Sequence, residues 1–334
     1  MFCRFLKGED DQIAIGSLKK LPDISKPRWD QNTYGGRARH FFSTVDPGNV
    51  FISNAKLETS RQIVTDYKTG KYDPRLTLGQ LWEAKRAFDS AFHPETGEKM
   101  FILGRMSSQV PCNMILNGGL LTFRTGLPSV FMHWSNQSFN AVVNYTNRSG
   151  DGASNQRLFL SYCCATGGAV GCALYLNSKV VNAAGLLPRL IPFAAVALAN
   201  AINIPMMRSK ELQFGVALRD KDGNEVGKSQ YTAVLAISQV VFSRICMAAS
   251  TMVTVPLLMK PIEKLKFYKG RPGLWAPLIQ TLLAGFTLTI TTPLCCAFSK
   301  QNASIEVSRL EKSVQSQIKS LPNPPTVVYY NKGL

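Results

Sequence analysis

A row of asparagines is the pattern in this sequence best suited to binding a small polar molecule. Asn136, Asn140, Asn144 and Asn147 recur at helical spacing between two apolar stretches. A carboxamide offers a donor and an acceptor together, so several on one face can hold the amine and the carboxylate of a zwitterion at once. The alternative is a polar helix face at a membrane boundary, and the spacing leaves both interpretations open.

Arg244 is the sharpest single candidate, because it lies within a long apolar stretch, residues 231–259. A cation at the middle of a membrane helix costs roughly 2.5–3.5 kcal/mol on insertion scales, so it is expected to face the protein interior and to be paired. Its partner can be a substrate carboxylate, or backbone carbonyls freed near prolines. We favour the carboxylate, which makes Arg244 a predicted substrate-binding residue.

A dense polar turn precedes the first apolar stretch, in the segment Phe92-His93-Pro94-Glu95-Thr96-Gly97-Glu98-Lys99-Met100. Pro94 disfavours helical geometry in the residue before it, and Gly97 permits a sharp turn, so a preceding helix should stop here. At the mouth of a membrane segment such a turn can bind a substrate or gate a path. The alternative, which the local sequence favours, is a helix-stop loop with solvated charges. The candidates for binding or gating are His93, Glu95, Thr96 and Glu98.

The elements that must position these residues are membrane helices. Hydrophobic residues make up 45% of the chain and charged residues only 18%, and the long apolar runs follow residue 100. Five stretches approach the ~20 residues needed to cross a bilayer: 101–123, 158–176, 186–205, 231–259 and 274–298. The first is the weakest, because Arg105, Asn113 and Asn117 interrupt it, and a broken or re-entrant helix is an alternative there. The predicted fold is all-α, a polytopic helical membrane protein with about five transmembrane helices.

Three parts of the chain follow from this pattern. Residues 1–100 are predicted to form a small soluble helical region, with a helix near 53–67 that ends at Gly70 and another that starts at the capping box of Thr77 and Gln80. Residues 101–299 form the transmembrane domain. Residues 300–334 form a tail in which 304–318 is predicted to be a short amphipathic helix.

Charge gives a prediction of orientation. The formal net charge is +17, and five of the cations crowd the short loop 260–271, which should therefore face the cytosol or the mitochondrial matrix. Such a loop could also bind anionic lipid head groups such as cardiolipin. An odd number of spans places the N-terminal region on that same side and the tail on the opposite side. The mixed-charge loop 208–228 is expected on the same side as the tail. The cations flank apolar segments rather than aromatic clusters, so nucleic acid is not an expected partner.

Several classes of function lack their sequence signatures. The chain has no P-loop, no dinucleotide-binding fingerprint, no G-x-S-x-G and no H-E-x-x-H, so no enzyme activity and no cofactor are predicted. Eight cysteines and three histidines form no metal-binding spacing, and the cysteines are predicted to be small buried hydrophobes. The first residues resemble neither a secretory signal nor an acid-poor transit peptide.

A series of motifs runs in order along almost the whole chain. They are Pro27-Arg28-Trp29-Asp30-Gln31, Gly36-Arg37-Ala38, His40-Phe41-Phe42, the turn from Ala91 to Met100, Asn136-Gln137-Ser138-Phe139-Asn140, Asn144-Tyr145-Thr146-Asn147, Ile202-Asn203-Ile204-Pro205, Thr292-Pro293-Leu294-Cys295-Cys296-Ala297 and Asn331-Lys332-Gly333-Leu334. On these residues the chain resembles the sideroflexins, a family of the mitochondrial inner membrane once described as tricarboxylate carriers. One position departs from the family turn, where Glu95 stands in place of the usual aspartate.

The resemblance implies a multi-pass transporter of the mitochondrial inner membrane, with its N-terminus in the matrix and no cleaved presequence. The pattern is most similar to members assigned serine transport for one-carbon metabolism, with alanine, cysteine and glycine as further substrates. Two alternatives stay open. A carrier of citrate-like anions would need several converging cations, whereas the apolar segments offer chiefly Arg244. A membrane scaffold for iron handling or respiratory-complex assembly would use the turn at His93 for docking.

Overall fold

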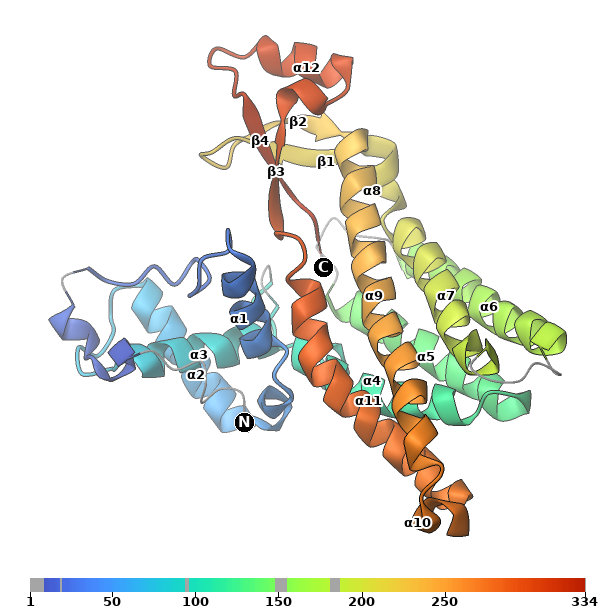
Figure 1. Ribbon diagram of the computed structural model, residues 1–334. Helices are drawn as coiled ribbons and strands as arrows, with labels where there is room; N and C mark the ends of the chain where they lie inside the picture. The colour runs from blue at the N-terminus through green and yellow to red at the C-terminus, as the bar shows by residue number, and fades with distance from the viewer. Residues whose placement is uncertain (1–8, 19, 94–95, 148–154, 181–186, 334) are drawn as a thin grey trace.

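The computed structural model describes residues 9–18, 20–93, 96–147, 155–180 and 187–333. Figure 1 shows three parts: a helical N-terminal region in blue, a set of long helices in green to orange, and a small sheet with a helix against it at one end of the long helices. The mostly helical, polytopic fold predicted from the sequence is therefore confirmed.

Three helices make up most of the N-terminal region: α1 (Tyr34–Thr44), α2 (Asn54–Lys68) and α3 (Leu78–Ala91). The capping box predicted at the start of α3 is present, with the Thr77 side chain accepting from the Gln80 amide and the Gln80 side chain accepting from the Thr77 amide. Gly70 follows α2 with a φ of 75°, which is the left-handed conformation expected of a C-terminal cap. The local signals for α2 and α3 were thus sufficient, whereas α1 was not predicted from the sequence.

The N-terminal region packs against one end of a long helix, α11 (Pro272–Cys296). Ala38 and Phe41 of α1 form a buried cluster with Leu288 and Ala297. The guanidinium of Arg37 donates from Nε to the Ala297 carbonyl at 2.8 Å, and the Tyr34 hydroxyl donates to the Leu294 carbonyl at 3.2 Å. These bonds satisfy carbonyls at the C-terminal end of α11, which the helix itself leaves unpaired.

Four helices in the described parts of the chain are long and apolar enough to cross a membrane. They are α6 (Asn155–Val180), the segment Pro188–Met207 that contains α7 (Ile191–Met207), α9 (Gln230–Ile262) and α11. Large apolar side chains such as Phe159, Phe242 and Phe286 are exposed on their outer faces, as lipid-facing residues would be. A short helix, α10 (Lys266–Gly270), lies in the basic loop between α9 and α11.

The first predicted span is interrupted, as its polar residues suggested. Two single 3-10 turns, Ile102–Gly104 and Met106–Ser108, lead into α4 (Gln109–Thr122), which has only 14 residues. The following α5 (Gly126–Thr146) is a full 21-residue helix, and it carries the asparagine row. Gly118 lets α4 approach α11 closely, because a Cβ there would lie 2.1 Å from the Thr281 hydroxyl.

The sheet was not foreseen in the sequence. Its four strands pair in the order β2 (Glu225–Ser229), β1 (Val216–Arg219), β4 (Val327–Asn331), β3 (Asn302–Glu306), all antiparallel. The short α8 (Ser209–Phe214) leads into it, and α12 (Lys312–Lys319) covers it around buried Leu218, Ile318 and Val328. The helix predicted at 304–318 is therefore wrong in its first half, because Ile305 pairs with Val328 in a ladder set by distant sequence.

Candidate functional site

A polar cavity of about 100 Å³ lies among α4, α5, α7, α9 and α11, inside the body of long helices. That volume exceeds the roughly 10–15 Å³ required by a single water, so it has room for a small solute. Its polar lining residues are Gln109, Asn113, Asn117, Asn136, Asn140, Asn200, Ser243, Arg244, Thr292, Cys296 and Lys332. The lining is thus rich in carboxamides, and no aspartate or glutamate is among the described residues that form it.

Helical periodicity explains how the chain concentrates these groups. Gln109, Asn113 and Asn117 recur every four residues on α4, so they share one face of that helix. Asn136 and Asn140 do the same on α5. Two helices that turn their polar faces toward each other therefore create a polar interior between apolar outer faces.

Arg244 projects into this cavity from α9. Arg244 is half-buried, and among the described residues it has no hydrogen-bond acceptor and no carboxylate partner, although a cation withdrawn from water normally requires one. Cys296 and Thr292 of α11 line the same space and carry no formal charge of opposite sign. The arrangement is thus a fixed positive charge facing a cavity of neutral donors and acceptors, which suits a ligand carboxylate.

Two further groups lack partners in the same place. The amide nitrogens of Gln109 and Asn136 are buried, and no acceptor lies within hydrogen-bond distance of them in the described chain. The Asn136 side chain is 3% exposed and that of Gln109 is 7% exposed. An unmade buried hydrogen bond costs on the order of 1–3 kcal/mol, so these donors are suited to a bound ligand rather than to the fold.

A smaller cavity of about 50 Å³ continues from the first toward the sheet. The two cavities share Asn140, Asn200, Val240 and Arg244 in their walls. Asn144, Asn203 and Arg208 line only the smaller one. Of the nine predicted site residues, the structure therefore brings together Asn136, Asn140, Asn144 and Arg244.

The polar turn lies elsewhere. His93, Thr96 and Glu98 line an open groove with Tyr145 of α5 and Tyr162 of α6, and none of the three lines either cavity. Backbone bonds close the turn, with the His93 amide donating to the Glu98 carbonyl at 2.8 Å and the Gly97 amide to the His93 carbonyl at 2.9 Å. Gly97 has a φ of 67°, as expected for the sharp turn. Glu95 lies outside the described residues, and gating by this turn stays a prediction.

Asn147, the last member of the asparagine row, has a different environment. Its side-chain nitrogen donates to the carbonyls of Gly104 at 2.7 Å and Val143 at 2.8 Å. It therefore ties the end of α5 to the 3-10 turn before α4. With both contacts made to backbone, Asn147 does not face either cavity.

Sequence analysis missed Gln109, Asn200 and Lys332 as site residues, and it mentioned Asn113 and Asn117 only as interruptions of an apolar stretch. The signal was present, because polar residues four apart within an apolar helix mark one inward face. Lys332 gave no such signal, since it follows a strand that only the sheet positions. Within the described residues, no three His, Cys, Asp or Glu side chains gather into a group that could hold a metal ion.

Comparison with known proteins places the whole chain among related sequences. The family profile described as "Sideroflexins" matches residues 23–334. Sideroflexin-1.1 of Caenorhabditis elegans is 57% identical over 319 residues, covering 94% of this chain and 97% of the relative. Human Sideroflexin-3 and Sideroflexin-1 are 51% and 50% identical, each over 96% of this chain and over 100% and 99% of their own lengths. No solved structure gives a significant match.

Proposed function

This chain belongs to the sideroflexin family, and we propose that it transports small neutral amino acids, serine first, across the mitochondrial inner membrane. Family membership supports a transporter-type role, and the four apolar helices make the chain a membrane protein. The substrate, the organelle and the link to mitochondrial one-carbon metabolism are parts of the proposal. No enzyme activity is proposed.

The observation that carries the proposal is the unpaired Arg244 in a carboxamide-lined cavity. A guanidinium binds a carboxylate through charge-assisted hydrogen bonds that can be bidentate. The side-chain oxygens of residues such as Asn136 and Asn140 can accept from an ammonium or a hydroxyl, while their nitrogens donate. Serine, alanine, cysteine and glycine share the carboxylate and the ammonium and differ only in a small side chain. The same groups therefore serve all four, and serine alone uses a further hydroxyl contact.

A second candidate is a carrier of small di- or tricarboxylates. One observation favours it: the cavity has two cations, Arg244 and Lys332, and no acidic residue in its described lining. An excess of positive charge attracts an anion with more than one carboxylate. The small volume and the preponderance of neutral carboxamides favour the amino acid.

The basic loop 260–271 supplies the expected membrane contact. Lys260, Lys264 and Lys269 are exposed near the ends of α9 and α10. By the charge rule for membrane proteins this loop faces the matrix, where it would meet anionic head groups such as those of cardiolipin.

Purified protein reconstituted into liposomes tests the proposal. We expect saturable uptake of labelled serine. Unlabelled alanine, cysteine and glycine should reduce this uptake by competition. Citrate uptake without serine uptake would support the second candidate, a carrier of di- or tricarboxylates. Flux of neither, in protein shown to be folded and inserted, would leave a non-transporting role such as a scaffold.

A further inference from the structure

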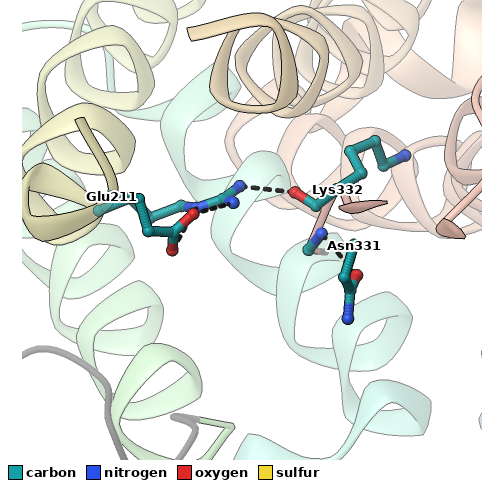
Figure 2. A network of polar contacts seen from close by, with 5 residues as sticks. Glu211, Asn331 and Lys332 are labelled. Atoms are coloured by element: carbon teal, nitrogen blue, oxygen red, sulfur yellow. Dashed lines mark hydrogen bonds and ion pairs between the residues drawn. The ribbon is translucent and has the colours of Figure 1, made fainter. Parts of the chain in front are cut away.

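The C-terminal end of the chain contributes Lys332 to the wall of the larger cavity. After β4, the Lys332 amide donates to the Gln301 carbonyl at 2.7 Å, and the Lys332 carbonyl accepts from Nη1 of Arg208, also at 2.7 Å. Arg208 itself is held by the Glu211 carboxylate at 3.0 Å from its Nε. Figure 2 shows the Lys332 carbonyl directed toward this ion pair and the Lys332 amine pointing away from it.

The Lys332 side chain reaches the cavity wall, where Arg244 and Cys296 also lie. It is 4% exposed, and its ammonium donates to the Ser299 hydroxyl at 2.7 Å. No carboxylate of the described residues pairs with it. Burial lowers the pKa of Lys332, which is the expected response of a lysine that lacks a counter-ion. A ligand carboxylate in the cavity would supply that counter-ion.

We propose that Lys332 is the second carboxylate-binding group of this cavity, brought there by a C-terminal segment, residues 331–333, that acts as its closure. The inference rests on the proposed transport function and names the residues of its site. A substrate carboxylate then meets Arg244 from α9 and Lys332 from the tail, while its ammonium meets carboxamide oxygens. The amino acid is enclosed only when the C-terminal segment is in place.

The contacts of Arg208 make this segment a latch. Arg208 lines the smaller cavity and also holds the Lys332 carbonyl, so one side chain joins the wall of the site to its closure. Gly333 has a φ of 77°, and a Cβ there would lie 3.1 Å from Nη1 of Arg208. Any larger residue at this position would be strained and would crowd the guanidinium.

Serine uptake by reconstituted variants tests the carboxylate contact. Lys332→Gln should raise the KM for serine roughly tenfold or more, because a hydrogen bond to a charged group is lost. Lys332→Arg should recover most of the affinity. Lys319→Ala is the matched control, since Lys319 is an exposed lysine of the same domain that lines no cavity, and it should behave as wild type. An unchanged KM in well-inserted Lys332→Gln would overturn the inference while the transport function stands.

Labelling of Cys296 tests the closure without any transport assay. Cys296 lines the cavity. If the segment closes the cavity, an anionic methanethiosulfonate added to purified protein should label Cys296 faster when the segment is displaced. Arg208→Ala and Gly333→Ala should each raise labelling of Cys296 severalfold by mass spectrometry, whereas Lys319→Ala should not. Equal labelling in all four proteins would rule out the latch. This labelling measurement does not depend on serine transport. If the wild-type protein showed no serine flux, the proposed function would be wrong, but the closure could still be tested.

Discussion

The N-terminal region and the cavity between the long helices differ in whether their polar side chains have pairing partners. The N-terminal region contains ion pairs: Arg28 pairs with Asp11, Lys85 with Asp89, and Lys56 with Glu83 at 2.7 Å. In the cavity, Arg244 and the amide nitrogen of Asn136 have none among the described residues. The ion pairs contribute to the fold, whereas the cavity groups are, on the proposed function, paired by a bound ligand.

The difference gives a criterion for choosing among polar candidates. Burial alone does not separate the two regions, since both have buried polar groups. The ion pairs named above and the unpartnered cavity groups differ in whether a partner is present, and a buried group left unpaired reduces stability unless a ligand pairs with it. Variants in the two regions should therefore fail differently: loss of binding in the cavity, loss of stability in the paired region.

Arg244 gives the largest expected effect. Arg244→Ala should reduce serine uptake per inserted molecule by roughly a hundredfold, because a charge-assisted bond to the carboxylate is lost. Arg244→Lys should keep residual transport at weaker affinity, since lysine retains the charge without the planar fork. Reconstituted uptake and the amount of inserted protein must be measured together. If Arg244→Ala were degraded while Arg244→Lys transported serine normally, Arg244 would be a structural residue.

A matched pair of asparagines on α5 sharpens the comparison. Asn136→Leu should raise the KM for serine about tenfold while leaving thermal stability unchanged or slightly higher, because the lost amide nitrogen had no partner among the described residues. Asn147→Leu should lower thermal stability and leave the KM unchanged, because it removes two bonds to backbone. Thermal unfolding in detergent and uptake in liposomes measure the two effects. The reverse pattern would remove the asparagine row from the site.

Glu311 tests the paired behaviour in the sheet domain. Although burial raises the pKa of its carboxyl, hydrogen bonds from the Tyr231 amide at 2.6 Å and the Ser229 hydroxyl at 2.7 Å hold it below the ordinary value of 4.5. A depressed folded-state pKa contributes stability above pH 4.5 that is lost as the pH falls through the folded value. The protection factors of the β3 and β4 amides, which correct the exchange rates for their intrinsic pH dependence, should fall over that range in wild type. In Glu311→Gln, exchange of these amides should already be faster at neutral pH, and the loss of protection as the pH falls should be absent.

The polar turn has the smallest expected effect on transport. Glu98→Gln should change flux per inserted molecule by less than about twofold, because the turn is held by backbone bonds and lines neither cavity. Gly97→Ala should instead lower abundance, since its φ of 67° strains any residue with a Cβ. A large fall in flux in Glu98→Gln at normal abundance would support the turn as a gate.

Sequence reasoning succeeded where the signal is local. The capping box at Thr77, the stop at Gly70 and the helical asparagine row each depend on residues a few positions apart. Arg244 was identified because a charge in an apolar stretch needs an explanation. Family membership supports a transporter-type role, whereas the residues alone left transporter and scaffold open.

What sequence reasoning missed depends on distant contacts. The strands β1 and β4 are more than a hundred residues apart, and no local pattern pairs them. Lys332 is placed at the cavity by that sheet, so it could not be recognised before the strands were paired. The helix α5 was not among the five predicted spans, although the helical spacing of its asparagines was recognised, and two of these asparagines line the larger cavity.

The hydrogen bonds from Arg37 and Tyr34 hold the N-terminal region at the C-terminal end of α11. They therefore help to decide on which side of the membrane each end of the chain lies. The Gly104 carbonyl accepts a bond from Asn147, so the hairpin of α4 and α5 returns the chain to the leaflet from which it departed. The four long helices that follow add an even number of passages, and the last of them ends against α1. If each passes completely through the bilayer, the N-terminal region and the tail share one compartment, opposite the loop 260–271. The charge pattern predicts opposite compartments. In the shared arrangement, one protease added to that face would digest tags at both ends together.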